Sequence, residues 1–323
     1  MISCTEFIPL YSEFFKFLEQ KGGHEAVKEY WHFISDSNIG DLTNENSLGY
    51  KCSKLGGFEG AMSYWGHTLT EEACDMFEVR DNDKRFYYSH MRHCPSKGRL
   101  IGFEHIEPYY DYCEHCNVIY QRVLDKYGVV YERDHSRIDE AECRSILYEK
   151  GNKPDFDFKT VNDSSFSKSS NVSIVDLKSE DNKYLHRDFH LLGDNALKYC
   201  GDNYGKETVC LFLEEYVKNY YSPRIKSIKK GGLEVLKNWI EEVYDTEEAR
   251  EYLHTDLSDN KLTIIIEKSP VIEYMQSLNQ KPSEYYIEET RTLYAVIAKE
   301  SNLIFELEYY NEDGAAKFTF SCK

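Results

Sequence analysis

Apolar residues recur every three or four positions over residues 7–35, with one interruption at Gly22 and Gly23. This spacing is typical of a helix with one buried face, and a glycine pair is a usual place for such a helix to break. The same spacing predicts a pair of helices over residues 58–78. Thr70, followed by two glutamates, has the chemistry of an N-cap for the second helix of that pair.

Alternating and aromatic stretches predict strands between the helices. Residues 84–93 alternate in polarity and carry three adjacent aromatic side chains, which predicts a strand ending at His93 and Cys94. Pro95 cannot continue a strand ladder, so it marks a turn. The same patterns predict short strands at residues 129–131 and 145–148. They also predict a helix at 108–127 that begins at Pro108, and helical structure at 185–220.

The chain has 323 residues, about twice the usual domain size, so two domains are expected. Between residues 151 and 183 the composition turns polar and rich in serine, which is typical of a linker, although residues 172–175 could pair as a strand. We therefore predict an N-terminal domain over residues 1–150, a linker over 151–183 and a C-terminal domain over 184–323.

Short motifs recur in the same order in both halves, about 175 residues apart. The matches are Gly56-Gly57 with Gly231-Gly232, Pro95 with Pro270, and Tyr109-Tyr110 with Tyr285-Tyr286. The pattern predicts an α+β fold made of two tandem copies of one domain, each with a helical opening and a small sheet.

Composition narrows the classes of partner. The net charge of −18 argues against nucleic acid and against an anionic membrane surface, because both require clustered lysine and arginine. The N-terminus lacks a basic start followed by an apolar core, and no segment reaches the ~18–20 apolar residues of a membrane span. Ten unevenly spaced cysteines then indicate reduced thiols in the cytoplasm. A homo-oligomer is left open.

Four cysteines of the first half stand at the junctions of predicted elements: Cys94, Cys113, Cys116 and Cys143. Two residues separate Cys113 from Cys116, so both thiolates could reach one ion at about 2.3 Å. Cys94 and Cys143 could complete a tetrahedral zinc site, and the second half lacks all four thiols at the matching positions. Zinc is therefore one candidate cofactor.

Two other interpretations of these cysteines stay open. They could be buried and inert, since free cysteine is among the most buried residue types. They could also be reactive, with Cys94 or Cys113 as a nucleophile. His93 and Cys94 point to opposite faces of a strand, so His115, His105 or a residue from elsewhere in the chain would have to serve as the base. A helix that begins at Pro108 would place Cys113 beyond its first turn, which weakens a thioredoxin-like interpretation.

A second group of candidates surrounds these cysteines. Tyr109, Tyr110, Tyr112 and His93 could line a pocket for a small molecule, although aromatic residues fill cores just as often. In the second half, His186 and His190 have the spacing of two ligands on one helix face. An exposed or capping pair of histidines at a helix start explains that spacing better than a metal site does.

Three motifs together resemble the L-2-amino-thiazoline-4-carboxylic acid hydrolase family: Met91-Arg92-His93-Cys94-Pro95, Tyr109-Tyr110-Asp111-Tyr112-Cys113-Glu114-His115-Cys116, and Glu142-Cys143 before a final strand. Named members of the family open a thiazoline ring with water. The arrangement is also similar to vinyl-reductase-type ligand-binding domains, in which cysteines and a glutamate can hold zinc near a pocket.

The resemblance implies a small-molecule hydrolase that acts on a cyclic C–N bond in a thiazoline- or amidine-like substrate. Cys94, Cys113 and His115 would be catalytic, and Cys94, Cys113, Cys116 and Cys143 would be the metal ligands. The alternative is a zinc-containing small-molecule-binding or sensory protein without turnover.

Overall fold

The computed structural model describes the backbone of residues 1–323 and the side chains of all residues outside 66–71. The helices are α1 (Phe7–Ile34), α2 (Leu48–Leu55), α3 (Gly57–Glu71), α4 (Pro95–Gly102), α5 (Glu114–Leu124), α6 (Asp188–Tyr204), α7 (Lys206–Tyr220), α8 (Ser222–Thr246), α9 (Pro270–Ser277) and α10 (Ile287–Glu300). The strands are β1 (Asp75–Asp81), β2 (Phe86–His93), β3 (Val129–Asp134), β4 (Cys143–Glu149), β5 (Val172–Leu177), β6 (Leu253–Leu257), β7 (Lys261–Ile266), β8 (Leu303–Tyr310) and β9 (Ala316–Cys322).

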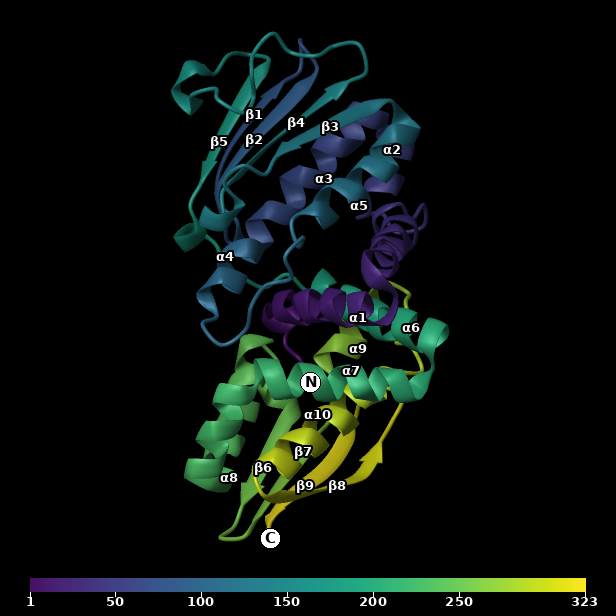
Figure 1. Cartoon of the computed structure of the whole chain (residues 1–323), viewed down its shortest axis with the longest axis vertical. Helices are drawn as coiled ribbons and strands as arrows, with labels where there is room; N and C mark the ends of the chain where they lie inside the picture. The colour runs from purple at the N-terminus through teal and green to yellow at the C-terminus, as the bar shows by residue number, and fades with distance from the viewer. The chain divides into compact units, whose positions relative to one another are not determined.

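The elements form an α+β protein with two antiparallel sheets, as the sequence predicted (Figure 1). The chain divides into two compact units. We call residues 18–186 the thiol unit, because this unit carries the four cysteines that were predicted to form a site. Residues 1–17 together with 187–323 form the terminal unit. No helix in the described part of the chain is long and apolar enough to cross a membrane.

The thiol unit is built on a five-stranded sheet with the order β3-β4-β2-β1-β5. Helices α3 and α5 lie along one face of this sheet (Figure 1). The second face is apolar, because alternate residues of β1, β2 and β4 point to it and form one buried cluster. Its members are Phe77, Val79, Phe86, Tyr88, Ile146, Tyr148 and Phe158.

The segment predicted as a linker belongs to the thiol unit. Its strand β5 pairs with β1 along the edge of the sheet, with Val79 opposite Ile174. Phe156 and Phe166 pack on the apolar cluster and cover that face of the sheet. Hence the boundaries at 150 and 183 differ from those of the structure, and the first 17 residues belong with the second half of the chain. This serine-rich segment also contains a few widely spaced apolar residues that pack on the sheet, and its overall composition did not reveal them.

The terminal unit has a four-stranded sheet with the order β6-β7-β9-β8. Helices α8 and α10 pack on this sheet. Helix α7 packs against α10, and α6 packs against α7. The first turns of α1 join this unit through aromatic contacts, since Phe7 stacks on Phe189 and Phe14 meets Phe212 edge-on. These contacts explain why the N-terminal residues cluster with the second half of the chain.

The two units share one order of elements: a helix, two strands, two helices and two strands. Without β5, the strand order of the first sheet also matches that of the second. Cys94 is the N-cap of α4 and Ser269 is the N-cap of α9, and each of these helices begins with a proline. This likeness of topology is what a duplication would produce, and the tandem duplication itself stays a prediction.

Three local predictions are corrected by the structure. Residues 58–78 are not a helix pair, because α3 ends at Glu71 and β1 starts at Asp75. No helix starts at Thr70, whose side chain lies outside the described residues. Helix α5 begins at Glu114 rather than at Pro108. The break at Gly22 and Gly23 is confirmed, since Gly23 has a φ of 70°.

Candidate functional site

The four predicted cysteines gather at one end of the sheet in the thiol unit. Cys143 opens β4 opposite the end of β2, and Cys94 follows β2 as the N-cap of α4. Cys113 is the N-cap residue of α5, and Cys116 lies in the first turn of that helix. Burial raises the pKa of Cys94, and Cys143, Cys116 and Cys113 raise it further. The thiols are therefore close enough to act on one another.

Arg133 on β3 lies among these thiols. Its Nη2 donates a hydrogen bond to Cys143 Sγ over 2.9 Å, and its Nη1 donates to the Tyr131 hydroxyl over 2.8 Å. Burial alone would lower the pKa of Arg133, but Cys143, Tyr131, Cys116 and Cys94 raise it well above the usual value. Its buried Nε has no hydrogen-bond partner among the described residues. A fixed positive charge thus stands inside the cluster.

Arg133 was not among the predicted site residues, although the sequence carries a signal for it. The predicted strand at 129–131 continues to Asp134 in the structure. Alternation along a strand puts Val129, Tyr131 and Arg133 on the same face. Extending that strand by two residues would have directed Arg133 toward the side that Cys143 also faces.

The zinc site predicted at the four thiols stays a prediction. Within the described residues, the group of cysteine, histidine and acidic side chains whose donor atoms lie within 4.8 Å of one another is Cys4, His190 and Glu247, in the terminal unit. The four thiols do not form such a group. The guanidinium of Arg133 also repels a cation at this place, whereas it stabilises an anion.

Cys116 and His115 form a second polar contact in the cluster, with Sγ and Nε2 3.5 Å apart. His115 Nδ1 is hydrogen-bonded to the backbone carbonyl of Tyr112. A carbonyl only accepts, so Nδ1 must carry the proton and Nε2 is the nitrogen that faces the thiol. A thiol, a histidine that faces it and a carbonyl that orients the histidine form the same series of nucleophile, base and orienting group that is found around activated cysteines.

The electrostatics separate Cys116 from the other three thiols. Burial raises the pKa of Cys113 to about 12 and raises that of Cys143, where Arg133 opposes it. Burial also acts against the Cys116 thiolate, but the charge of His115, then that of Arg133 and the hydrogen bond with His115 lower the pKa of Cys116 to about 7. The Cys116 thiolate is therefore favoured relative to the thiolates of Cys94, Cys113 and Cys143, whose pKa values are raised.

The pKa of His115 is raised above its usual value by the same pairing. Burial alone would lower it, but the charge of Cys116, the hydrogen bond with Cys116 and the hydrogen bond to the Tyr112 carbonyl raise it. The start of α5 after Cys113 places Cys116 in the first turn of the helix, where the helix dipole favours a thiolate. The corrected start of α5 thus removes the objection to a reactive thiol.

The predicted substrate-binding residues fall into two groups. Tyr112 is buried against the ring of His115, with 4.8 Å between the ring centroids. The hydroxyl of Tyr109 lies 3.0 Å from His24 Nδ1, and Tyr110 donates to Glu19. These two tyrosines therefore contact the second half of α1.

His93 is exposed, and its ring lies against the backbone of Gly98. Cys94, Cys113 and Cys116 are partly exposed residues. A pocket of about 50 Å³ adjoins Cys143 at the end of the sheet, and its other lining residues are Asp134, Ser136, Arg137, Glu142, Arg144 and Lys159.

The predicted pair of His186 and His190 does not share a helix face. His186 precedes α6, which begins at Asp188, and its Nε2 lies 3.7 Å from a carboxylate oxygen of Glu72. His190 lies within α6 and contacts Glu247 at 2.9 Å.

The chain was compared with models of known protein families, with curated proteins and with solved structures, and none of the three comparisons gives a match.

Proposed function

We propose that the thiol unit is a hydrolase that opens a cyclic C–N bond in a small amidine- or thiazoline-like molecule, with Cys116 as the nucleophile and His115 as the base. One observation carries this proposal: His115 presents Nε2 to the Cys116 thiol while the Tyr112 carbonyl holds its Nδ1–H. This assignment moves the nucleophile from Cys94 and Cys113 to a cysteine that the sequence analysis took only as a metal ligand.

The reaction would proceed through a covalent intermediate. The Cys116 thiolate forms a bond to the amidine carbon, and the His115 imidazolium gives its proton to a ring nitrogen. His115 then moves a proton from the other amidine nitrogen to this ring nitrogen, which leaves as an amine when its C–N bond breaks. Water, deprotonated by His115, adds to the resulting thioimidate, and the C–S bond breaks to release an amide and regenerate the thiolate and the imidazolium.

Arg133 and Lys97 indicate the charge of the substrate. The buried Lys97 lies close enough to Cys113 to lower the pKa of that thiol, against the larger effect of burial. A buried lysine and a partly buried arginine in one cluster favour an anionic ligand such as a carboxylate. The substrate of the family that the three motifs resemble carries a carboxylate on its ring, and the free Nε–H of Arg133 could donate to it.

The covalent intermediate provides the test. The full-length protein would be mixed with L-2-amino-thiazoline-4-carboxylate or with a cyclic amidine carboxylate, quenched in acid and digested for peptide mass spectrometry. The proposal predicts an adduct on the peptide that contains Cys116, together with a ring-opened product. The Cys322→Ser variant, altered at an exposed thiol of the other unit, should form the same adduct. Ring opening with an adduct on Cys94, or ring opening in a Cys116→Ala variant, would overturn the assignment.

A further inference from the structure

We propose that the terminal unit contains a site for a zinc-type divalent cation, with Cys4, His190 and Glu247 as ligands and a fourth position directed to a neighbouring pocket. The site is independent of the thiol chemistry proposed above, because all three residues belong to the other unit.

The three donor groups converge from separate parts of the chain. Cys4 lies in the short 3₁₀ helix Cys4–Glu6, His190 lies in the first turn of α6, and Glu247 follows the end of α8. Their donor atoms all lie within 4.8 Å of one another. The side chains are buried, with exposed fractions of 1%, 7% and 2% in the same order. Such convergence in the interior is what a metal site requires.

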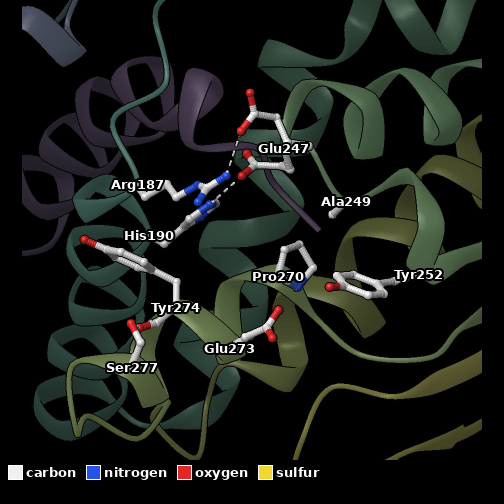
Figure 2. A pocket seen from close by; sticks show the side chains of 10 residues that line it. Arg187, His190, Glu247, Ala249, Tyr252, Pro270, Glu273, Tyr274 and Ser277 are labelled. Atoms are coloured by element: carbon white, nitrogen blue, oxygen red, sulfur yellow. Dashed lines mark hydrogen bonds and ion pairs between the residues drawn. The ribbon is translucent and has the colours of Figure 1, made fainter.

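The two oxygens of Glu247 have different partners. Oε1 accepts hydrogen bonds from Ser3 Oγ over 2.6 Å and from the backbone N–H of Cys4 over 2.7 Å. These bonds fix the carboxylate so that Oε2 faces His190 Nε2 at 2.9 Å. Figure 2 shows His190 and Glu247 turned toward each other in this way. Hydrogen-bonded partners of this kind around a ligating carboxylate are typical of metal sites.

A metal ion would take the place of the proton that His190 and Glu247 share. Tetrahedral ligands at 2.0–2.3 Å from zinc lie about 3.3–3.8 Å from one another. The 2.9 Å separation of Nε2 and Oε2 would therefore have to grow by less than about 1 Å. A change of this size needs only small rotations of two side chains, because Glu247 stays held through its other oxygen.

The donor set and its charge suit zinc. Sulfur, nitrogen and carboxylate oxygen together are the ligands of a borderline-soft divalent ion. A thiolate and a carboxylate with a neutral imidazole carry two negative charges, which a divalent ion neutralises in this buried position. Arg187, whose charge acts on Cys4, is paired with Glu248 at 3.0 Å.

A pocket beside the three ligands indicates where the fourth ligand of the metal ion would lie. It has a volume of about 280 Å³, and His190 and Glu247 stand in its wall. Figure 2 shows the other side chains around it, with Pro270 and Glu273 coming from α9. Its remaining lining residues are Arg187, Glu248, Ala249, Tyr252, Tyr274 and Ser277. Three protein ligands with an open fourth position are typical of zinc that binds water or a small oxygen ligand.

Zinc alone is the probe for the test. The full-length protein would be dialysed against a chelator, reloaded with zinc, freed of excess ion and assayed by elemental mass spectrometry. We expect one zinc per chain in the wild type and in the His254→Gln and Glu251→Gln controls, which change an exposed histidine and an exposed glutamate of the same unit. The His190→Gln and Glu247→Gln variants should lose at least nine tenths of this zinc. Equal zinc in all of these proteins, or no uptake by the wild type, would overturn the proposal.

A measurement on the wild type alone covers the case in which a variant does not fold. X-ray absorption of the zinc-loaded protein should show one sulfur at about 2.3 Å and nitrogen or oxygen ligands at about 2.0–2.1 Å. A shell of three or four sulfurs would contradict the proposal, because it would place the ion at the cysteines of the thiol unit.

Discussion

Replacing Cys116 by alanine is expected to lower kcat/KM for cyclic amidine hydrolysis by about a thousand- to ten-thousand-fold. The variant loses the atom that bonds to the amidine carbon, and no other described thiol of the cluster has the same contact with a histidine nitrogen that faces it. Steady-state kinetics with the ring-opened product as the readout would measure the loss. The fold should survive, because Cys116 is partly exposed and donates no hydrogen bond that holds an element in place.

The matched control is Cys113→Ala, at the N-cap of the same helix. Burial raises the pKa of Cys113 to about 12, so this thiol is protonated at neutral pH and cannot attack. The variant should keep kcat/KM within about tenfold of the wild type. A large loss in Cys113→Ala with a small loss in Cys116→Ala would move the nucleophile to Cys113 and contradict the account.

The second large effect concerns stability. In protein freed of metal, Glu247→Ala should lower the free energy of unfolding of the terminal unit by about 3–5 kcal/mol. The carboxylate accepts hydrogen bonds from Ser3, Cys4 and His190 at 2.6–2.9 Å, and its removal leaves these buried donors without an acceptor. Urea unfolding followed by hydrogen exchange would report each unit separately. Glu251→Ala, at an exposed glutamate nearby, should change the value by less than about 1 kcal/mol.

The same carboxylate predicts a dependence on pH. Burial would raise the pKa of Glu247, but its hydrogen bond and charge interaction with His190, and the bonds from Ser3 and Cys4, lower it to about 2. A carboxyl with a depressed pKa stabilises the folded state above its unfolded value, near 4.3, and this contribution is lost as the pH falls toward 2. Glu247→Ala should therefore be less sensitive to acid over this range than the wild type. An equal decline in both proteins would contradict the prediction.

The elements of the sheets were predictable where alternation and aromatic residues were dense. The strand that ends at His93 and the break at Gly22 and Gly23 follow from local chemistry alone. The segment 151–183 was not predictable in this way, because its role depends on a few apolar side chains that pack on a distant strand. Likewise, the first 17 residues join the second half through aromatic contacts at long sequence separation, which no local pattern encodes.

The residue types of the candidate site were predictable from the sequence, but the roles of the individual residues were not. Sequence spacing placed the four cysteines at element ends, where the structure also has them. It could not place Arg133 among them, and the charge of this side chain favours an anion or a thiolate over a metal cation. Nor could it show that α5 starts after Cys113, which puts Cys116 in the first turn. The group of Cys4, His190 and Glu247 depends on three separate segments, so only His190 drew attention beforehand.

The central claim is that Cys116 is a thiolate at neutral pH because His115 faces it. Alkylation of the native full-length protein with iodoacetamide, followed peptide by peptide at a series of pH values, tests this claim most directly. We expect Cys116 to react first, with a midpoint near pH 7, while Cys94, Cys113 and Cys143 react slowly up to pH 9. A midpoint near 8.5, the value of an ordinary thiol, or a rate for Cys116 no faster than that for Cys113, would contradict the account.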